Sequence, residues 1–458
     1  MEMRSFHVPA RPVRPVSSNT NRSFLSQDPF GDGRAQTVSR ASSIKSGITA
    51  KTAPAKAPVK FKSSRLIGEY EKPWLENRDP RLKYDRIIFW VFGLIASGVG
   101  AYIAYNGWVT FTPQNYCLQF EDDFLSGIDP SHWTYDIQTG GFGTGSFDWT
   151  TDDPANAYTD ADGLHIVPTL TIDSTDITEA QLLDGYTLNL TTAGTCTTDD
   201  YKHCSVKSNK TTDTIIPPAR SARLVTRGKQ TLQYGKIEVV AKLPKGDWLW
   251  PAIWMMPQDS VYGDWPRSGE IDIMEARGND RDSGIGRDTV GGALHWGPSS
   301  ELDMFMKTMG DTSLSRGDYS DDFHTFGLLW SPNYILVYVD MVLKQSIYVP
   351  FGKSSGDMYN RGGFGAMDNK GNGPPGNPWA LSRNYNAPFD QEFYLILNVA
   401  VGGTSGYFPD GVDGKPWADK VNGSASQFWK ARSSWEPTWG EGAARGMTVK
   451  KVSMWKVC

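Results

Sequence analysis

Three carboxylates stand close together in the stretch SGEIDIMEARGN, residues 268–279. Glu270, Asp272 and Glu275 fall within six residues, and the residues between them are Ile, Ile and Met. A pattern of this form arises by chance in about one of ten chains of this length. Taken alone, the pattern indicates no more than a half-solvated strand with a polar face. The geometry of the strand has to distinguish such a face from a catalytic site.

The geometry of a β-strand brings the three side chains together. Residues two apart share a face, so Glu270 and Asp272 point the same way, and strict alternation sends Glu275 to the other side. One extra residue, which we take to be Met274, makes a β-bulge that turns Glu275 back, and bulges are common beside active sites. Two carboxyls about 5–5.5 Å apart are what a retaining glycosidase uses. We expect Asp272 to shift the pKa of each glutamate and to share a proton with the attacking one.

Aromatic residues flank this motif on both sides. Indole faces stack on the flat C–H faces of sugar rings, so carboxylates fringed by Trp indicate a polysaccharide cleft. Each Trp taken singly fits a core position equally well, and the histidine also fits a strand position with a backbone partner. The candidates for substrate contact are Trp250, Trp254, Trp265, His295 and Trp296.

The elements that must position these side chains are strands. Segments rich in β-branched and aromatic residues, most of them bounded by Gly, Pro or Asn, predict an antiparallel all-β sandwich of jelly-roll type. Two long irregular segments, 170–218 and 353–388, are expected as surface insertions that wall or cover the cleft. The clearest strand segments are 236–244, 324–330, 334–340, 393–401 and 447–457.

A membrane helix is expected before the sandwich. Residues 87–105, IIFWVFGLIASGVGAYIAY, are nineteen residues without a charge, about the length that crosses a bilayer. A cleaved signal peptide is disfavoured because the segment begins so far into the chain. The remaining divisions are a disordered cytoplasmic tail, a juxtamembrane segment, a linker and a globular body, at residues 1–65, 66–86, 106–116 and 117–458.

The charges predict which way this helix is inserted. Residues 1–86 contain 17 Lys+Arg and 8 Asp+Glu, whereas the net charge of the chain is −5. From Ile87 to Tyr201 there is no Lys or Arg. The positive-inside rule therefore predicts a single-pass type II protein with a cytoplasmic N-terminus and a lumenal or extracellular body. The total charge gives no indication of nucleic-acid binding, and the sequence does not define an oligomeric state.

The cysteines agree with an oxidising compartment, since all four follow the expected anchor. Four cysteines allow three pairings, of which we favour a short staple, Cys196–Cys204, and a link between the first and last strands, Cys117–Cys458. Their spacing does not suit a zinc site. Sequons for N-glycosylation, which would fit a secreted body, begin at Asn189, Asn209 and Asn422.

Five segments together resemble a known family. GDWLWPAIWMMP, YGDWPRSGEIDIMEARGN, GALHWG, DFHTFGLLWSPNYILVYVD and FYLILNVAVGG are similar, in this order, to glycoside hydrolase family 16. The likeness is to its laminarinase-like branch and to the β-1,3-glucan recognition proteins, and it covers roughly 117–458. It implies a jelly roll of the concanavalin A-like lectin/glucanase type that cleaves or transfers β-1,3 or mixed-linkage glucan with retention.

The resemblance also implies roles for individual residues. Glu270 matches the nucleophile, Asp272 the assisting carboxylate and Glu275 the acid/base, and the aromatic positions match the glucan cleft less securely. No cofactor is required. A structural calcium ion is allowed, and FEDDF at 120–124 offers acidic groups, although no ligand set can be derived.

The expected anchor separates this chain from simple secreted laminarinases. Its architecture is similar to fungal membrane-bound members that build cell-wall β-glucan, which favours wall remodelling and a fungal source. A non-catalytic, membrane-anchored β-glucan receptor stays open as the alternative function. The chain retains all three carboxylates, of which glucan recognition proteins commonly lack one or more, and this favours the enzyme.

Overall fold

The computed structural model describes residues 67–76, 79–110, 114–281, 284, 286–353, 355–367 and 373–458. The tail expected at 1–65 and part of the expected linker lie outside the described residues. The chain divides into two units whose boundary falls between Pro113 and Gln114.

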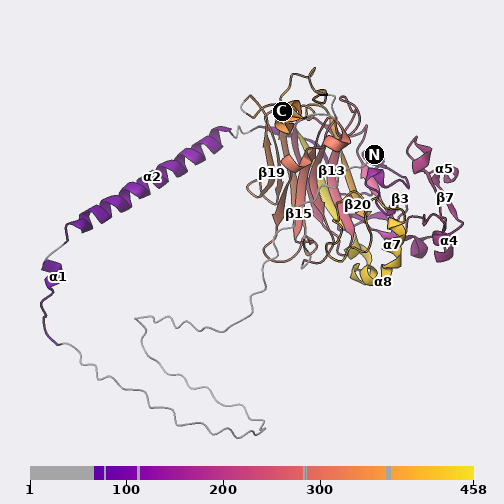
Figure 1. Cartoon of the computed structure of the whole chain (residues 1–458), viewed down its shortest axis with the longest axis horizontal. Coiled ribbons are helices and arrows are strands. Elements are labelled where there is room, and N and C mark those ends of the chain that lie inside the picture. The colour runs from indigo at the N-terminus through magenta and orange to yellow at the C-terminus, as the bar shows by residue number, and fades with distance from the viewer. Residues whose placement is uncertain are drawn as a thin grey trace, which may run out of the picture. The chain divides into compact units, whose positions relative to one another are not determined.

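In the described part of the N-terminal unit, the regular elements are helices. They are α1 (Pro73–Glu76) and α2 (Arg81–Thr110), and Figure 1 shows α2 as one continuous helix. Its segment Lys83–Gly107 is long and apolar enough to cross a membrane, by length and composition. The anchor expected at 87–105 lies inside this segment.

The body is built from two large sheets (Figure 1) in which every described strand pair is antiparallel. The first follows the order β19 (Gln345–Pro350), β18 (Tyr334–Val339), β17 (His324–Ser331), β12 (Gly235–Lys242), β21 (Met447–Val457), β5 (Gly163–Ile166) and β4 (Ala157–Asp160), with β1 (Tyr116–Asp122) paired to β21. The second follows the order β16 (Gly310–Ser313), β15 (Thr289–His295), β14 (Glu270–Ala276), β13 (Leu249–Pro257), β20 (Phe393–Val401), β10 (Arg223–Val225) and β2 (Thr134–Tyr135), with β11 (Thr231–Leu232) paired to β20.

The core lies between these sheets. Along β12 every second residue is buried, so Ile237 and Val239 point inward while their neighbours are partly exposed. They belong to the same core cluster as Ile253 and Met255 of β13 in the other sheet. This period-two pattern is what a strand with one buried face produces. The all-β sandwich of jelly-roll type expected from the sequence is confirmed.

Shorter elements cover the edges and ends of the sandwich. Two small sheets contain β3 (Asp148–Thr150), β9 (Ala219–Ser221) and β6 (Thr169–Leu170), and β7 (Thr187–Asn189) and β8 (Ser205–Lys207). The α-helices are α3 (Thr171–Ser174), α4 (Glu179–Leu183), α5 (Leu190–Ala193), α6 (Met358–Gly362), α7 (Ser424–Lys430) and α8 (Arg432–Trp435). The 3-10 helices are η1 (Gly141–Gly143), η2 (Tyr201–His203), η3 (Ser300–Leu302), η4 (Phe305–Lys307), η5 (Phe364–Ala366), η6 (Glu436–Thr438) and η7 (Gly442–Arg445).

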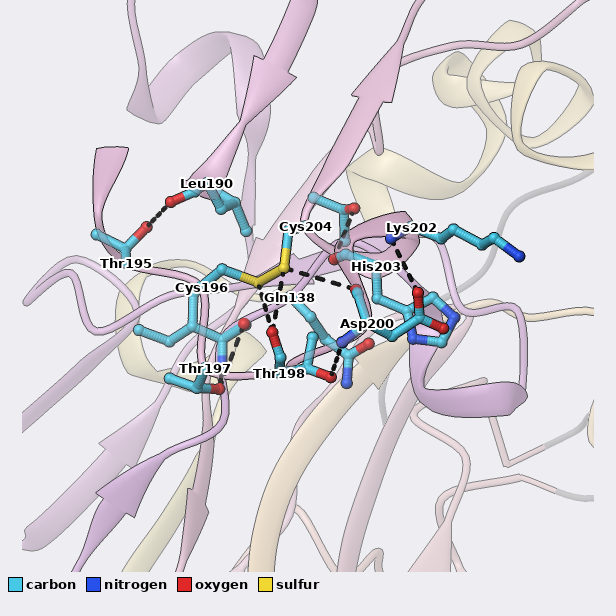
Figure 2. The surroundings of a disulfide bond; sticks show 12 residues. Gln138, Leu190, Thr195, Cys196, Thr197, Thr198, Asp200, Lys202, His203 and Cys204 are labelled. Carbon is cyan, nitrogen blue, oxygen red and sulfur yellow. Dashed lines mark hydrogen bonds between the residues drawn. A yellow bond between two sulfur atoms is a disulfide. The ribbon is translucent and has the colours of Figure 1, made fainter. Parts of the chain in front are cut away.

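Two disulfides join the cysteines in the pairing that the sequence favours. Cys117 of β1 is bonded to Cys458, so the first strand of the body is linked to the residue after its last strand. Cys196 and Cys204 close a short loop between α5 and β8, where the carbonyl of Thr198 lies against both sulfur atoms (Figure 2).

The three sequon asparagines, Asn189, Asn209 and Asn422, are all exposed. The side chain of Asn189 also caps α5 by accepting a hydrogen bond from the backbone N–H of Thr192. Glycosylation of these positions stays a prediction.

Candidate active site

Strand β14 carries the three carboxylates and is irregular between them. Met274 pairs with Ile253 of β13, and the next pair joins Asp272 to Trp254. Ile273 therefore has no partner in β13, and the pairing with β15 shifts at the same place. Ile273 and Met274 are both buried in the core. Two consecutive side chains thus point inward, which is the signature of a β-bulge.

The bulge expected from the sequence is present, but Met274 is not its extra residue. The unpaired position is Ile273, one residue earlier. Both assignments put one more residue between Asp272 and Glu275 than alternation allows, so both turn Glu275 to the face of Asp272. The sequence could not distinguish them because Ile and Met are equally apolar, and the choice depends on pairing with β13.

A histidine lies directly across from the first glutamate. Glu270 of β14 pairs with His295 at the end of β15. One ligand atom each of Glu270, Asp272 and His295 lie within 4.8 Å of one another. The Nε2 atom of His295 is 3.2 Å from Oδ2 of Asp272, and its Nδ1 atom is 2.6 Å from Oδ2 of Asp303. His295 therefore bridges two carboxylates.

Two tryptophans hold the two glutamates. Trp265 donates its indole N–H to Oε2 of Glu270 at 2.5 Å, and Trp250 donates its own to Oε1 of Glu275 at 2.9 Å. A hydrogen bond donated to a carboxylate favours the ionised form and fixes its orientation. The glutamates are thus held by different donors at opposite ends of the motif.

Burial and mutual repulsion raise the pKa values of all three carboxyls. Burial, followed by the charge of Asp272, raises the pKa of Glu270 to about 8. Burial, followed by the charge of Glu275, raises the pKa of Asp272 to about 6, and burial also raises the pKa of Glu275. Because each negative charge disfavours the next, the trio retains a proton near neutral pH. An acid and a base can then coexist in one site.

His295 carries the compensating positive charge. Burial lowers its pKa, but the charge of Glu270 and the contacts with Asp272 and Asp303 outweigh burial and raise the pKa well above its usual value. In the charged form both ring nitrogens carry a proton and face carboxylates: Nδ1 donates a hydrogen bond to Asp303, and Nε2 forms an ion pair with Asp272. Glu270, Asp272 and His295 are also close enough to hold a metal ion, which would have to displace the proton from a ring nitrogen of His295 to bind there.

The aromatic candidates lie in three different environments. Trp265 is 41% exposed beside Glu270, so part of its indole surface is open to a ligand. Trp254 is partly exposed, donates its N–H to Oδ1 of Asn398 at 2.7 Å, and has the guanidinium of Arg223 4.7 Å from its ring centroid. These two residues can contact a substrate, Trp265 more openly than Trp254.

Trp250 is enclosed by another ring. Tyr407 stacks parallel to it, with ring centroids 3.9 Å apart and an interplanar angle of 2°. Arg277 in turn lies 4.3 Å from the centroid of Tyr407. Trp250 is 8% exposed, so in this conformation it holds Glu275 and leaves little indole surface for a sugar.

Trp296 was expected to contact substrate, and the structure shows that this expectation is wrong. Its side chain is fully buried and donates its N–H to Oγ1 of Thr308 at 2.8 Å. Along β15, His295 points to the carboxylates, and the next residue follows the opposite side of the strand into the core. Outside a bulge, adjacent positions point to opposite faces of a strand, so both cannot line one groove.

Two residues at the site were not predicted from the sequence. Asp303 holds His295 from a loop, and Tyr407 covers Trp250 from the segment after β20. Asp303 also accepts backbone N–H groups from Trp296 and Phe305. Neither residue belongs to a periodic pattern or a motif, so only the three-dimensional structure brings them to the carboxylates.

The acidic segment considered for calcium makes contacts within the protein. Asp122 accepts hydrogen bonds from the backbone N–H of Phe124 and the indole N–H of Trp133, both at 2.8 Å. Glu121 accepts one from the hydroxyl of Ser453 at 2.9 Å. These bonds occupy oxygens that a calcium ion would need, and a calcium site here stays a prediction.

Comparisons with known proteins agree with this geometry. The family model "Glycosyl hydrolases family 16" matches residues 191–359, which include the whole carboxylate motif. A β-1,3-glucan-binding protein of Penaeus monodon is 40% identical over 348 residues, covering 74% of this chain and 90% of that protein. A glucan endo-1,3-β-glucosidase A1 of Niallia circulans is 38% identical over 184 residues, covering 40% of this chain and 22% of that protein.

A solved structure is also similar. The laminarinase catalytic domain of Thermotoga maritima shares 25% sequence identity, covers 75% of this chain and 99% of its own, and has a TM-score of 0.46. The relatives named here come from an arthropod and from bacteria. The fungal source favoured from the sequence stays a prediction.

Proposed function

Because the chain belongs to glycoside hydrolase family 16, we propose that its body is a retaining β-glucan hydrolase or transglycosylase. The observation that carries this proposal is the arrangement of Glu270, Asp272 and Glu275 along one bulged strand, with raised carboxyl pKa values and a charged histidine among them. A protein that only binds glucan does not require three neighbouring carboxyls that retain a proton near neutral pH. The proposed substrate is a β-1,3 or mixed-linkage glucan.

The proposed reaction runs in two steps. When the proton of the trio lies on Glu275, the ionised Glu270 attacks the anomeric carbon, and the proton of Glu275 goes to the leaving glycosidic oxygen as that bond breaks, which gives a covalent glycosyl-enzyme. Glu275 then takes a proton from the incoming acceptor, whose oxygen displaces Glu270 and restores the original configuration. Water as acceptor gives hydrolysis, and a glucan hydroxyl gives transfer.

Neighbouring residues assist both steps. As charge leaves Glu270 on attack, the hydrogen bond from Trp265 and the repulsion by Asp272 both weaken. Trp250 keeps Glu275 oriented through its N–H. The imidazolium of His295 holds Asp272 in place and limits the repulsion among the three carboxylates.

The test uses laminarin and three proteins: wild type, Glu270→Gln and Glu275→Ala. We expect wild type to release products of retained configuration by NMR, and Glu270→Gln to be inactive. With an activated aryl glycoside, Glu275→Ala should form the glycosyl-enzyme and regain turnover when azide is added, because azide needs no general base. Undiminished activity of Glu270→Gln, or no product from wild type, would overturn the proposal.

The alternative function, a non-catalytic β-glucan receptor, is favoured by one finding, namely that the Penaeus monodon relative is named as a β-1,3-glucan-binding protein. Binding of laminarin by wild type without any turnover would support it.

The cellular setting that we propose is a type II membrane protein, anchored by α2, whose body acts on cell-wall glucan outside the cytoplasm. Lumenal exposure of the sequons, tested by glycosidase treatment of the full chain, checks that topology.

A further inference from the structure

Four side chains around the acid/base candidate form a closed ring of contacts. Glu275 of β14 accepts the indole N–H of Trp250 at 2.9 Å, and the ring of Trp250 lies against Tyr407 with centroids 3.9 Å apart. The guanidinium of Arg277 lies 4.3 Å from the centroid of Tyr407. Arg277 follows Glu275 by two residues, so this series of contacts returns to the segment on which it began.

The indole of Trp250 can hold Glu275 only in one orientation, because it has a single N–H and a hydrogen bond weakens steeply when the donor turns away. Trp250 pairs with Ala400 of β20, which fixes its backbone but not the rotation of its side chain. Tyr407 lies across the indole at an interplanar angle of 2°, and Phe408 lies nearly perpendicular to it, at 86°. The stacked ring of Tyr407 therefore restricts the rotation of the indole.

Tyr407 is itself held in place from two sides. Its backbone carbonyl accepts hydrogen bonds from Nε of Arg277, at 3.1 Å, and from Nη2 of the same side chain. The next residue, Phe408, is buried and packs against Trp248 and Trp417. Tyr407 is only half-buried, so its ring supports Trp250 without being a member of the core.

The stack should matter more to a reaction than to folding. One aromatic pair contributes a small part of the stability of a domain of this size. A general acid must lie within hydrogen-bond distance of the oxygen that it protonates, and a displacement of about 1 Å can lower a rate about 100-fold. Loss of the ring is thus expected to change proton transfer by Glu275 in a protein that remains folded.

We propose that Tyr407 is a positioning residue for Glu275 and acts through Trp250. Its ring keeps the indole N–H directed at the carboxyl group, and Arg277 keeps the ring in place. The flat ring carries out this role, and the phenolic hydroxyl is not required. The inference rests on the proposed function for the role of Glu275 as acid/base, but the contacts themselves can be observed without turnover.

A kinetic test measures kcat/KM of the full-length protein in detergent, because kcat/KM reports the steps up to the glycosyl-enzyme. Two aryl glycosides of a β-1,3-linked glucan disaccharide are compared, one with a phenyl and one with a dinitrophenyl leaving group. Tyr407→Leu and Tyr407→Ala remove the flat ring, and Tyr407→Phe keeps it. Tyr348→Ala is the matched control, since Tyr348 lies beside the ring of Tyr334 in the other sheet, with centroids 5.9 Å apart. Thermal melting shows whether each variant is folded.

We expect both variants without the ring to lose about 100-fold in kcat/KM for the phenyl glycoside, which needs a proton on its leaving oxygen. Dinitrophenolate leaves without a proton, so the loss with its glycoside should be less than about tenfold. Tyr407→Phe and Tyr348→Ala should keep wild-type values with both. Equal losses with the two glycosides would reveal a merely structural role and overturn the inference. Faster turnover without the ring would also overturn it, by showing that Tyr407 obstructs the sugar.

A second measurement follows the contact itself. In full-length protein with isotopically labelled tryptophan, the indole N–H signal of Trp250 in NMR spectra is identified by its absence from Trp250→Phe. We expect this N–H to exchange with solvent at least about tenfold faster in Tyr407→Leu than in wild type or Tyr407→Phe. An inactive wild type would refute the proposed function alone. An unchanged exchange rate in folded Tyr407→Leu would overturn this inference whether or not the protein is active.

Discussion

At the scale of single residues, the positive charge of His295 offsets the negative charge of the three carboxylates. The imidazolium lowers the pKa values of Glu270, Asp272 and Glu275, against the raising effect of burial. In His295→Gln that positive charge is gone, so these pKa values rise further. Because Glu270 must be ionised to attack, the acidic limb of kcat/KM should move to higher pH, by about one to three units. A pH–rate profile on an aryl glycoside measures this shift.

Asp303→Asn provides the comparison. It keeps the imidazole but removes a carboxylate that raises the pKa of His295, so the acidic limb should move in the same direction by a smaller amount. If His295 merely supported the local structure, His295→Gln would lower kcat at every pH, and the acidic limb of the kcat/KM profile would stay at the same pH. That outcome would contradict the electrostatic role.

At the scale of the element, the bulge decides how β14 presents its carboxylates. Ile273 is the residue without a partner in β13, so its deletion would leave Met274 paired with Ile253 and Asp272 with Trp254. Glu275 would keep its face in a regular ladder. We expect the ΔIle273 protein to fold but to lose about 2–5 kcal/mol of stability with one buried aliphatic side chain, and about 100-fold in kcat because the carboxyls are displaced by about 1 Å.

Deletion of Ile271 is the matched control, because Ile271 pairs with both neighbouring strands. Its removal would turn Glu270 from the groove to the core face and should prevent folding. Denaturant unfolding and kcat distinguish the two deletions. Equal damage from both would show that Ile273 is not the extra residue.

The same strand shows how far the sequence could predict this molecule. Local periodicity in the sequence predicts the strand β12, the hairpin of β17 and β18, and a bulge in β14. The burial of Trp296, the choice of Ile273 over Met274, and the approach of Tyr407 to Trp250 depend on contacts between segments far apart in the chain. Local pattern carries no information about such contacts.

At the scale of the whole molecule, Cys117–Cys458 links the two ends of the body. It spans 341 residues, whereas Cys196–Cys204 spans 8. Loop-closure entropy predicts stabilisation of about 6 kcal/mol for the longer loop and about 2.5 kcal/mol for the shorter, with measured disulfides rarely exceeding about 5 kcal/mol. Replacing Cys458 by Ser should therefore destabilise the body more than replacing Cys204, although Cys458 lies at the end of the chain and Cys204 is buried.

The pairing of β1 with β21 holds the two ends of the body together even without the Cys117–Cys458 disulfide. Six residue pairs join the two strands between Tyr116 and Asp122, so the native contact persists without the cross-link and the effect falls on the unfolded chain. Denaturant midpoints of Cys117→Ser/Cys458→Ser and Cys196→Ser/Cys204→Ser double variants, measured against the oxidised wild type, give the ranking. A larger loss from the short loop would mean that local packing around Cys204 outweighs chain entropy in the stability of the body.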